Sequence, residues 1–370
     1  MSIPFDKIFT GKTIIITGHT GFKGSWLCTW LHHLGANITG ISNDIVSDPS
    51  NYSASSVSSF VNDYRVDIRD TSKVASIIKE VQPDFVFHLA AQALVRPSYE
   101  SPIETMTTNA IGTANVLDAL RFVDKKIVAI MITSDKAYDN VEWVWGYRET
   151  DRLGGKDPYS ASKGMAELAI RSYVDSFFNV PDSNIRVGIT RAGNVIGGGD
   201  WAVDRIVPDC MEAWANSETV DIRSPHATRP WQHVLEPLSG YLCLAENLYL
   251  NDHNHGEAYN FGPSADQNYP VNELINEMSK YWDRIKWDDV SNNERHVHEA
   301  GLLKLNCDKA LFDLRWHSAL QFEETIKMTV EWYKEYYQHP NQSMYDFTIS
   351  QIKAYTKAAK LNNITWASND

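Results

Sequence analysis

The sequence predicts an α/β protein with a doubly wound parallel sheet and a smaller, mixed C-terminal lobe. Two observations lead to this class. In the first half of the chain, short apolar, β-branched runs alternate with segments of helical period, which is typical of a parallel sheet with helices on both faces. After Gly199 the alternation stops, and shorter segments with scattered Pro, Trp and Arg follow. A chain of 370 residues, 43% of them hydrophobic, can bury a large core and still supply a second lobe.

The elements of the sheet can be read in order along the chain. The predicted strands are "KTIIITG" (12–18), "NITGIS" (37–42), a short strand before "VDIRD" (66–70), "DFVFHLAA" (84–91), "KIVAIMITS" (126–134) and "IRVGITRAGNVIG" (185–197). Apolar residues at helical spacing predict the helices between them: "FKGSWLCTWLHHLG", "TSKVASIIKEV", "NAIGTANVLDALRFV" and "SASKGMAELAIRSYVDSFF". A further helix is expected at "HVLEPLSGYLCLAENLYL", and another near the C-terminus before a polar tail that we expect to fray.

Charge and cysteine usage exclude several classes of function. The net charge of −13 disfavours a nucleic-acid surface, which needs a cationic field. No apolar run reaches the roughly 20 residues of a membrane span, and the N-terminus shows no secretory signal. The cysteines are far apart, as expected for reduced thiols in a cytoplasmic protein: Cys28, Cys210, Cys243 and Cys307. The histidines of "ERHVHE" (294–299) alternate as on a strand face and lack a matching cluster, so we expect no metal site.

A glycine-rich turn follows the first strand. "TGHTGFKG" places Gly18, Gly21 and Gly24 between that strand and the first helix. Glycines in this context let the backbone approach a pyrophosphate, which the helix N-terminus then binds. The turn predicts a Rossmann fold that binds a dinucleotide. Lys23 could add charge to the phosphates, although a solvated lysine is the simpler interpretation.

The acid beyond the second strand indicates which dinucleotide binds. Asp44 lies where a carboxylate can accept a hydrogen bond from a ribose hydroxyl, although it could also be an ordinary loop residue. No Arg or Lys occurs between 41 and 60 to bind a 2′-phosphate, so we expect NAD. Asp67, after the next strand, could contact the adenine edge.

Tyr159 and Lys163 in "YSASK" are four residues apart, so on a helix their side chains share one face. A phenol is a poor base at neutral pH unless a cation stabilises the phenolate. A lysine one turn away, helped by a nicotinamide ring, would do so, and the pair could then remove a proton from an alcohol as hydride leaves. Such spacing is common on helices, and it gains weight here from the glycine-rich turn.

The glycine-rich turn, "HLAAQALV", Asn109 and the Tyr159/Lys163 pair resemble the extended short-chain dehydrogenase/reductase family, which acts on nucleotide sugars. The resemblance runs from about residue 10 to 335. Longer strings are similar to the 4,6-dehydratase branch of that family: "GHTGFKGSWL", "TSDKAYDN", "RAGNVIGGGDWA" and "RPWQHVLEPLSGYL".

The resemblance implies CDP-glucose as substrate and bound NAD as cofactor. Tyr159 would take the proton of the sugar 4-hydroxyl while hydride leaves C4. Asp135 would be the acid for the departing 6-hydroxyl, and Ser134 would hydrogen-bond the 4-oxygen. Related enzymes that act on dTDP-glucose carry a glutamate base where this chain has Lys136. Lys136 is either a base of lowered pKa or an ammonium that stabilises the enolate, and a merely structural Asp–Lys ion pair is the competing interpretation.

The resemblance also implies the remaining site residues. The cofactor residues would be Gly18, Thr20, Gly21, Phe22, Lys23, Gly24, Asp44, Asp67, Ile68, Leu89, Ala90, Ala91, Asn109, Thr133, Tyr159 and Lys163. The substrate would contact Arg96, Ser134, Asn194, Trp201, Arg205 and Arg229, in segments that also carry Arg191, Arg223 and Trp231. Arginine suits bidentate contact with phosphate, and an aromatic face can stack on a pyrimidine.

The expected domains are a Rossmann domain over 1–190, to which 230–262 returns, a substrate-binding lobe from 191–229 and 263–340, and a C-terminal helix and tail over 341–370. A homodimer is expected through paired helices, at 171–178 and "NVLDALRFV". Three alternatives stay open: a 4-epimerase, a GDP-sugar dehydratase, and a regulator that binds NAD without turnover. The adjacent Asp135 and Lys136 disfavour the epimerase, and the presence of both Tyr159 and Lys163 disfavours the regulator.

Overall fold

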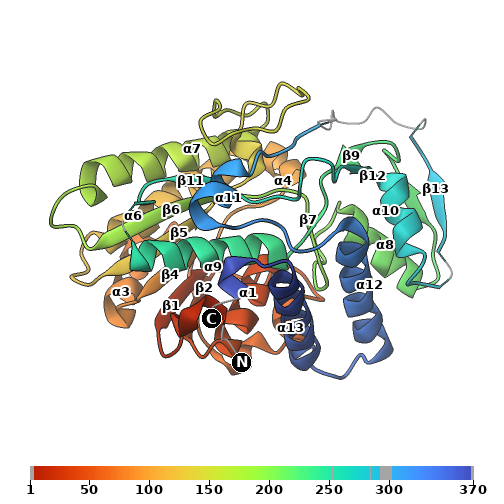
Figure 1. The fold of residues 1–370 in the computed structure, drawn as a ribbon, viewed down its shortest axis with the longest axis horizontal. Helices are drawn as coiled ribbons and strands as arrows, with labels where there is room; N and C mark the ends of the chain where they lie inside the picture. Colours follow the sequence, from red (N-terminus) through yellow and green to blue (C-terminus); the bar gives the residue numbers. More distant parts are fainter. Residues whose placement is uncertain (1–3, 252, 284, 292–301, 368–370) are drawn as a thin grey trace.

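The computed structural model describes residues 4–251, 253–283, 285–291 and 302–367, so the "ERHVHE" segment (294–299) lies outside the described residues. Its centre is a seven-stranded, wholly parallel sheet of order β11-β6-β5-β4-β1-β2-β3 (Figure 1). The predicted doubly wound α/β class is therefore confirmed. The strands are β1 (Thr13–Thr17), β2 (Asn37–Ser42), β3 (Val61–Arg65), β4 (Phe85–His88), β5 (Ile127–Ile132), β6 (Ile185–Arg191) and β11 (Ala258–Asn260).

Helices cover both faces of the sheet, because successive strand side chains point to opposite sides. Ile14 and Ile16 of β1 join one apolar cluster, while Ile15 between them joins the other. The first cluster lies under α1 (Phe22–His33) and α9 (Leu235–Leu250); the second lies under α3 (Thr71–Val81), α6 (Gly112–Leu120) and α7 (Pro158–Tyr173) (Figure 1). The other helices are α2 (Asn51–Ala54), α4 (Val95–Glu100), α5 (Pro102–Met106), α8 (Ile206–Ala215), α10 (Val271–Met278), α11 (Asp308–Leu314), α12 (Phe322–Gln338) and α13 (Tyr345–Leu361).

Strand order reverses between β1 and β4, which lie side by side although β2 and β3 intervene in the chain. In open α/β sheets, ligands bind at such a switch point, beyond the carboxyl ends of the strands. The glycine-rich turn after β1 and the "LAA" segment after β4 meet there. The fold therefore fixes one edge of the sheet as the place to look for a site.

A smaller lobe lies beside the carboxyl edge of the sheet, around α8, α10 and α12 (Figure 1). Its strands occur in short pairs: β7 (Val195–Ile196) with β10 (Gln232–His233), β8 (Val220–Ile222) with β13 (Trp287–Asp289), and β9 (Thr228–Arg229) with β12 (Tyr269–Pro270). The short pairs leave long loops between them, and these loops face the ends of β5 and β6.

The C-terminal tail is packed against the rest of the protein up to residue 367 and does not fray over that part. Trp366 is buried and stacks on Phe5, with ring centroids 4.9 Å apart, and it also packs against Trp30 of α1 and Tyr355 of α13. The expectation of a frayed end is therefore wrong for residues 365–367, because a single buried aromatic side chain outweighs the polar residues around it.

Three general features complete the fold. All four cysteines are free thiols, and three of them are buried. Within the described ranges, no helix combines the length and apolar content that crossing a bilayer requires. In the same part of the chain, no group of three or more His, Cys, Asp or Glu side chains is arranged to hold a metal ion.

Candidate active site

The glycine-rich turn brings the start of α1 against the loop that follows β4. Gly18 has a φ of +74°, and a Cβ there would lie 2.7 Å from the Ala90 nitrogen. A Cβ on Gly24 would lie 2.1 Å from the Gly18 carbonyl oxygen. Gly21 precedes α1 without a side-chain cap, so the first N–H groups of the helix remain available to a ligand. This cradle, which side chains would fill, fits the pyrophosphate of a dinucleotide.

Replacing Gly24 with Ala should disrupt this cradle, because backbone atoms at 2.1 Å cannot give way without moving the turn. We expect a loss of about 1–3 kcal/mol in the free energy of unfolding and a dissociation constant for NAD raised at least about 10-fold. Thermal unfolding and calorimetric titration with NAD measure the two effects. Gly11→Ala is the control: its Cβ meets nothing within 4 Å, yet its φ of +72° is strained, so stability should fall without a change in NAD affinity.

Other predicted cofactor residues are placed around this turn. The Thr20 hydroxyl donates to the Asp44 carbonyl oxygen at 2.6 Å, which ties the turn to the loop after β2. The Asp44 side chain is exposed and accepts a hydrogen bond from the Ile45 N–H, so the carboxylate is accessible to a ribose. Asp67 is less accessible, because Arg69 holds both of its carboxylate oxygens. Ile68 is buried against Gly112 of α6.

The segment Leu89–Ala91 is half-buried and is held in place by the end of β1. The Ala90 N–H donates to the Thr17 hydroxyl at 3.1 Å. Asn109 lies in a π-helical turn before α6, and its amide is used within the protein: it accepts from the Gln92 N–H and donates to the Gln92 carbonyl and to Ser162. Asn109 therefore positions the loop after β4 against α7. Its amide is already engaged in these hydrogen bonds within the protein at the cofactor edge.

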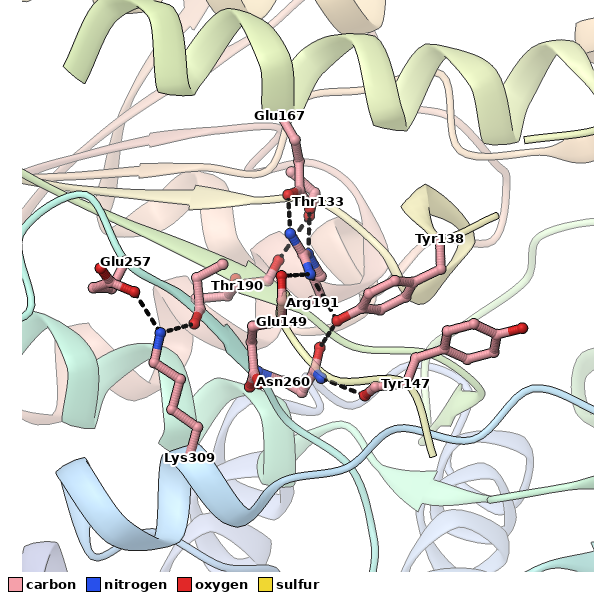
Figure 2. A network of polar contacts seen from close by, with 11 residues as sticks. Thr133, Tyr138, Tyr147, Glu149, Glu167, Thr190, Arg191, Glu257, Asn260 and Lys309 are labelled. Carbon is pink, nitrogen blue, oxygen red and sulfur yellow. Dashed lines mark hydrogen bonds and ion pairs between the residues drawn. The ribbon is translucent and has the colours of Figure 1, made fainter. Parts of the chain in front are cut away.

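A buried ion pair lies directly beneath the ends of β5 and β6. Arg191, the last residue of β6, pairs with Glu167 of α7 and donates to the Tyr138 hydroxyl at 2.6 Å and to the Glu149 carbonyl at 3.1 Å (Figure 2). Thr133 donates its hydroxyl to Glu167 at 2.7 Å. This geometry removes Arg191 from the group of arginines that could bind an anion, because its guanidinium is fully engaged below the site. The Thr133 hydroxyl is likewise directed into the protein.

We expect Arg191→Met to cost about 3–5 kcal/mol of folding free energy, since it leaves the Glu167 charge buried without its partner. Both side chains are at most 2% exposed, so solvent cannot compensate. Denaturant unfolding of the single variant and of Glu167→Gln/Arg191→Met measures the effect. The double variant should recover part of the loss; equal stability of Arg191→Met and the wild type would contradict this role.

A pocket of about 290 Å³ opens above this ion pair, between the sheet edge and the smaller lobe. Ser134, Asp135 and Lys136 line it from the turn after β5, and Tyr159 lines it from the first turn of α7. The predicted acid, lysine and phenol therefore face one cavity. The volume is at the lower end of the range for small-molecule sites.

Burial dominates the electrostatics of the Tyr159 and Lys163 pair. The Lys163 ammonium lies 6.0 Å from the centroid of the Tyr159 ring. Desolvation lowers the pKa of Lys163 to about 8, while the Glu167 carboxylate opposes that shift, so Lys163 remains mainly protonated at pH 7. Desolvation raises the pKa of Tyr159 to about 12, against the hydrogen bond with Ser134 and the charge of Arg205. In the chain alone, burial therefore raises the pKa of Tyr159 by more than the nearby cations, which we expected to stabilise the phenolate, lower it.

Asp135 and Lys136 do not form the structural ion pair considered above: both side chains are described, and the polar contact of the Asp135 carboxylate is with Ser134. Asp135 is 5% exposed and accepts from the Ser134 hydroxyl at 2.9 Å. A Cβ on Gly193 would lie 1.9 Å from Asp135 Oδ2, so the absence of a side chain at Gly193 makes room for the carboxyl. Lys136 is half-buried at the wall of the pocket.

The structure does not support the simpler interpretation of Lys23 as a solvated lysine. It lines the same pocket, and desolvation, with Arg205 and Lys163 acting in the same direction, lowers its pKa to about 8. Asp135 opposes the shift. The reason is the direction of the turn: α1 starts at the switch point, so a side chain in its first turn extends over the site.

The predicted substrate residues separate into two groups. Asn194, Arg205 and the neighbouring Trp231 line the pocket, and Arg205 also pairs with Asp200 at 2.7 Å. Trp201 does not line it: its ring lies 4.9–5.8 Å from those of Trp332, Tyr333 and Tyr336. This packing contradicts the prediction that Trp201 contacts substrate, because its indole is buried within an aromatic cluster.

Two of the predicted arginines lie outside the pocket lining. Arg96 is exposed and pairs with Asp204 at 2.7 Å, and Arg223 contacts the same acid. Arg229 lies on β9 and donates to the Thr228 carbonyl. Their contact with a ligand stays a prediction.

Sequence reasoning missed the role of Glu167. A signal was present, since Glu167 follows Lys163 by one helical turn and Tyr159 by two, which places it on the catalytic face of α7. It also missed His88, at the end of β4, whose ring bonds Thr17 at 2.7 Å and Thr113 at 2.9 Å. Burial lowers the pKa of His88 to about 3, so a neutral imidazole supports the floor of the cofactor edge.

Comparison with known proteins agrees with this geometry. The family model described as GDP-mannose 4,6 dehydratase matches residues 15–329. A CDP-glucose 4,6-dehydratase of Salmonella typhimurium is 46% identical over 89% of this chain and 92% of its own length. A dTDP-glucose 4,6-dehydratase of Streptomyces antibioticus is 26% identical over 87% of this chain and 92% of its own. Among solved structures, an epimerase from Methanothermobacter thermautotrophicus shares the fold with a TM-score of 0.76 at 22% identity, covering 90% and 95% of the two chains.

Proposed function

Because this chain belongs to the GDP-mannose 4,6-dehydratase family, a family of NAD-dependent nucleotide-sugar dehydratases, we propose that it converts CDP-glucose to CDP-4-keto-6-deoxyglucose. The observation that carries the proposal is the pocket itself, in which a phenol, a carboxyl group and a lysine face one cavity. Oxidation alone would need only the phenol and its lysine; loss of water also needs an acid. The identity of 46% to a relative described as acting on CDP-glucose supports the nucleotide.

The residues at the switch point fit NAD. The glycine cradle fits the pyrophosphate, and the exposed Asp44 carboxylate fits a ribose hydroxyl. Bound there, NAD⁺ would accept the hydride of C4, give it back to C6, and add the positive charge of its ring next to Tyr159.

The chain's own groups would then move the protons. Tyr159, hydrogen-bonded to Ser134, takes the proton of the 4-hydroxyl, and Lys163 favours the phenolate. The resulting 4-ketone acidifies the C5–H. Asp135 gives its proton to the C6 oxygen, which leaves as water. Lys136 borders the same space and either takes the C5 proton or stabilises the enolate as an ammonium.

Recognition of the diphosphate and the base would fall to the smaller lobe. Arg205 and Lys23 supply positive charge at the pocket, and Trp231 offers an aromatic side chain at its wall. Asn194 belongs to the same lining. An acidic protein can bind an anion here because the cations are concentrated locally.

The proposed division of the chain is a Rossmann domain over 1–190 and 230–262, with the substrate lobe in 191–229 and 263–340. It is supported by β11, which pairs with β6, and by α9, which packs on the sheet. A cytoplasmic location is also proposed, from the free thiols alone.

A homodimer is proposed through the outer helices of the sheet face that carries α7. Large apolar side chains are exposed on the two predicted segments, Phe122 at 71% and Phe177 at 39%, and next to them on α7, Leu168 at 60%. Such a patch marks an interaction surface. Leu168→Glu should convert a dimer to a monomer in light scattering coupled to size exclusion, whereas a wild-type monomer would contradict the proposal.

One experiment tests the function. The purified protein is incubated with NAD⁺ and CDP-glucose, and the alkaline absorbance of a 4-keto sugar is followed. We expect product with CDP-glucose and much less with GDP-mannose, dTDP-glucose or UDP-glucose. A 4-epimer as the product would favour the epimerase alternative, and inertness towards all four sugars would favour the regulator.

A further inference from the structure

A second, much smaller cavity also borders Asp135. Its volume is about 10 Å³, enough for one water molecule. Asp135, Gly193 and Asn194 border both this cavity and the substrate pocket. The other walls include Gln232, Gly262, Lys304 and Leu305. Asp135 is therefore shared between the two spaces.

Gln232 presents a fixed acceptor at this cavity. It is 2% exposed, and its Nε2 donates to the Gly193 carbonyl at 2.8 Å and to the Phe261 carbonyl at 3.1 Å. These two bonds set the orientation of the amide, so Oε1 can only accept. Oε1 is buried and has no hydrogen-bond partner among the described residues. A buried acceptor in a cavity of this size calls for a small donor.

Asp135 and Gln232 are linked through Gly193. The carboxyl packs so closely on Gly193 that a Cβ would lie 1.9 Å from Oδ2, and the carbonyl of the same glycine holds the Gln232 amide. Asp135 and Gln232 also line the same cavity, which has room for a single water molecule, so a donor there that reaches Gln232 Oε1 would lie close to Asp135.

We propose that Gln232 holds one water molecule against the Asp135 carboxyl, and that this water restores the proton that Asp135 gives up in each turnover. The inference rests on the proposed function. In the chemical step, the Asp135 O–H bond breaks, its proton joins the departing C6 oxygen, and the carbon–oxygen bond breaks to release water. The carboxylate that remains then receives a proton from the held water, which takes one from bulk solvent at the same time. Gln232 is a positioning residue in this scheme.

A route for protons is needed because the Asp135 side chain is buried. Asp135 is 5% exposed, and a sugar in the substrate pocket would cover the side on which it lines that pocket. The titratable groups around it are Lys23 and Tyr159 on the pocket side, Tyr241 of α9, its neighbour Lys136, and Lys304 at the small cavity. Lys304 is half-buried, so its end of the cavity is the side on which solvent can approach.

Two variants test the proposal with holoenzyme and CDP-glucose, by following enzyme-bound NADH at 340 nm and product formation. Gln232→Met removes the acceptor. Gly262→Ala leaves both Gln232 and Asp135 intact and narrows the cavity, since its Cβ would make ordinary contacts of 3.6 Å to Cys307 and 3.7 Å to Leu305. For both, we expect oxidation at the wild-type rate, a higher steady-state level of NADH, and kcat about 10-fold lower, well short of the roughly 10²–10⁴-fold contribution of a general acid.

Gln351→Met is the matched control. Gln351 is 5% exposed, its Nε2 donates to the Met328 carbonyl at 2.7 Å, and its Oε1 is also buried without a partner among the described residues, but it lies in α13 away from the pocket. It should lose stability without accumulating NADH. A crystal structure of the wild type should show the water between Asp135 and Gln232.

A dry cavity, or wild-type NADH levels in both site variants, would overturn the proposal. So would a parallel fall of oxidation and water loss, because that pattern indicates a purely structural role for Gln232. Wild-type protein that neither forms NADH nor yields product would refute the proposed function first, and the relay with it.

Discussion

Tyr159→Phe should abolish the first oxidation, with no NADH formed in a single turnover and kcat lowered by about 10²–10⁴-fold, the usual contribution of a positioned acid–base group. The phenol is 8% exposed and lines the pocket, and in the proposed reaction its hydroxyl takes the proton of the sugar 4-hydroxyl. Phenylalanine keeps the ring and its packing, so folding should be preserved. Stopped-flow absorbance at 340 nm with CDP-glucose measures the step.

Tyr64→Phe is the control for this prediction. The Tyr64 hydroxyl donates to Glu80 at an exposed position on β3. Loss of this hydroxyl should therefore leave the rate of NADH formation and kcat unchanged. A Tyr159→Phe enzyme that forms NADH at the wild-type rate would remove Tyr159 from the mechanism. Intact NAD binding in the inactive variant would show that chemistry, and not cofactor affinity, was lost.

Asp135→Asn should separate the two halves of the reaction. The amide cannot give a proton to the C6 oxygen, so water loss should slow by about 10²–10⁴-fold while oxidation proceeds. Enzyme-bound NADH should therefore accumulate, in contrast to Tyr159→Phe, where none forms. Single-turnover absorbance with product analysis by mass spectrometry distinguishes the two patterns.

Asp221→Asn, which changes an exposed acid on β8, should behave as wild type in this assay. If Asp135→Asn released the 4-keto-6-deoxy product at the wild-type rate, another group would have to be the acid. If the variant also failed to oxidise the sugar, the main role of Asp135 would be to position the sugar and not to donate the proton for water loss.

The parts of the site that depend on local sequence could be predicted. A β-branched run that stops at glycine fixes where β1 ends, and the four-residue spacing of Tyr159 and Lys163 fixes their common face on α7. Because parallel strands end at one edge, Asp135 after β5 had to lie near both of them. These inferences need no knowledge of the partner of any side chain.

Partners from distant parts of the chain could not be predicted. Arg191 ends β6 at the edge where an anion would bind, but Glu167 lies opposite it and pairs with it beneath the site. Trp201 stands in a loop that suits base stacking, and aromatic residues of α12 cover it instead. In both cases the residue type permitted two roles, and packing decided between them.

The contact between Phe5 and Trp366 has a consequence for how the protein is made. Trp30 of α1 packs against Tyr355 and Trp366, so one side of the first helix gains its cover from the opposite end of the described chain. Residues 355–366 must therefore have left the ribosome before that surface is sealed. Until then, chaperones would meet the uncovered indole of Trp30 on α1, and deletion of 345–367 should yield insoluble protein rather than a working fragment.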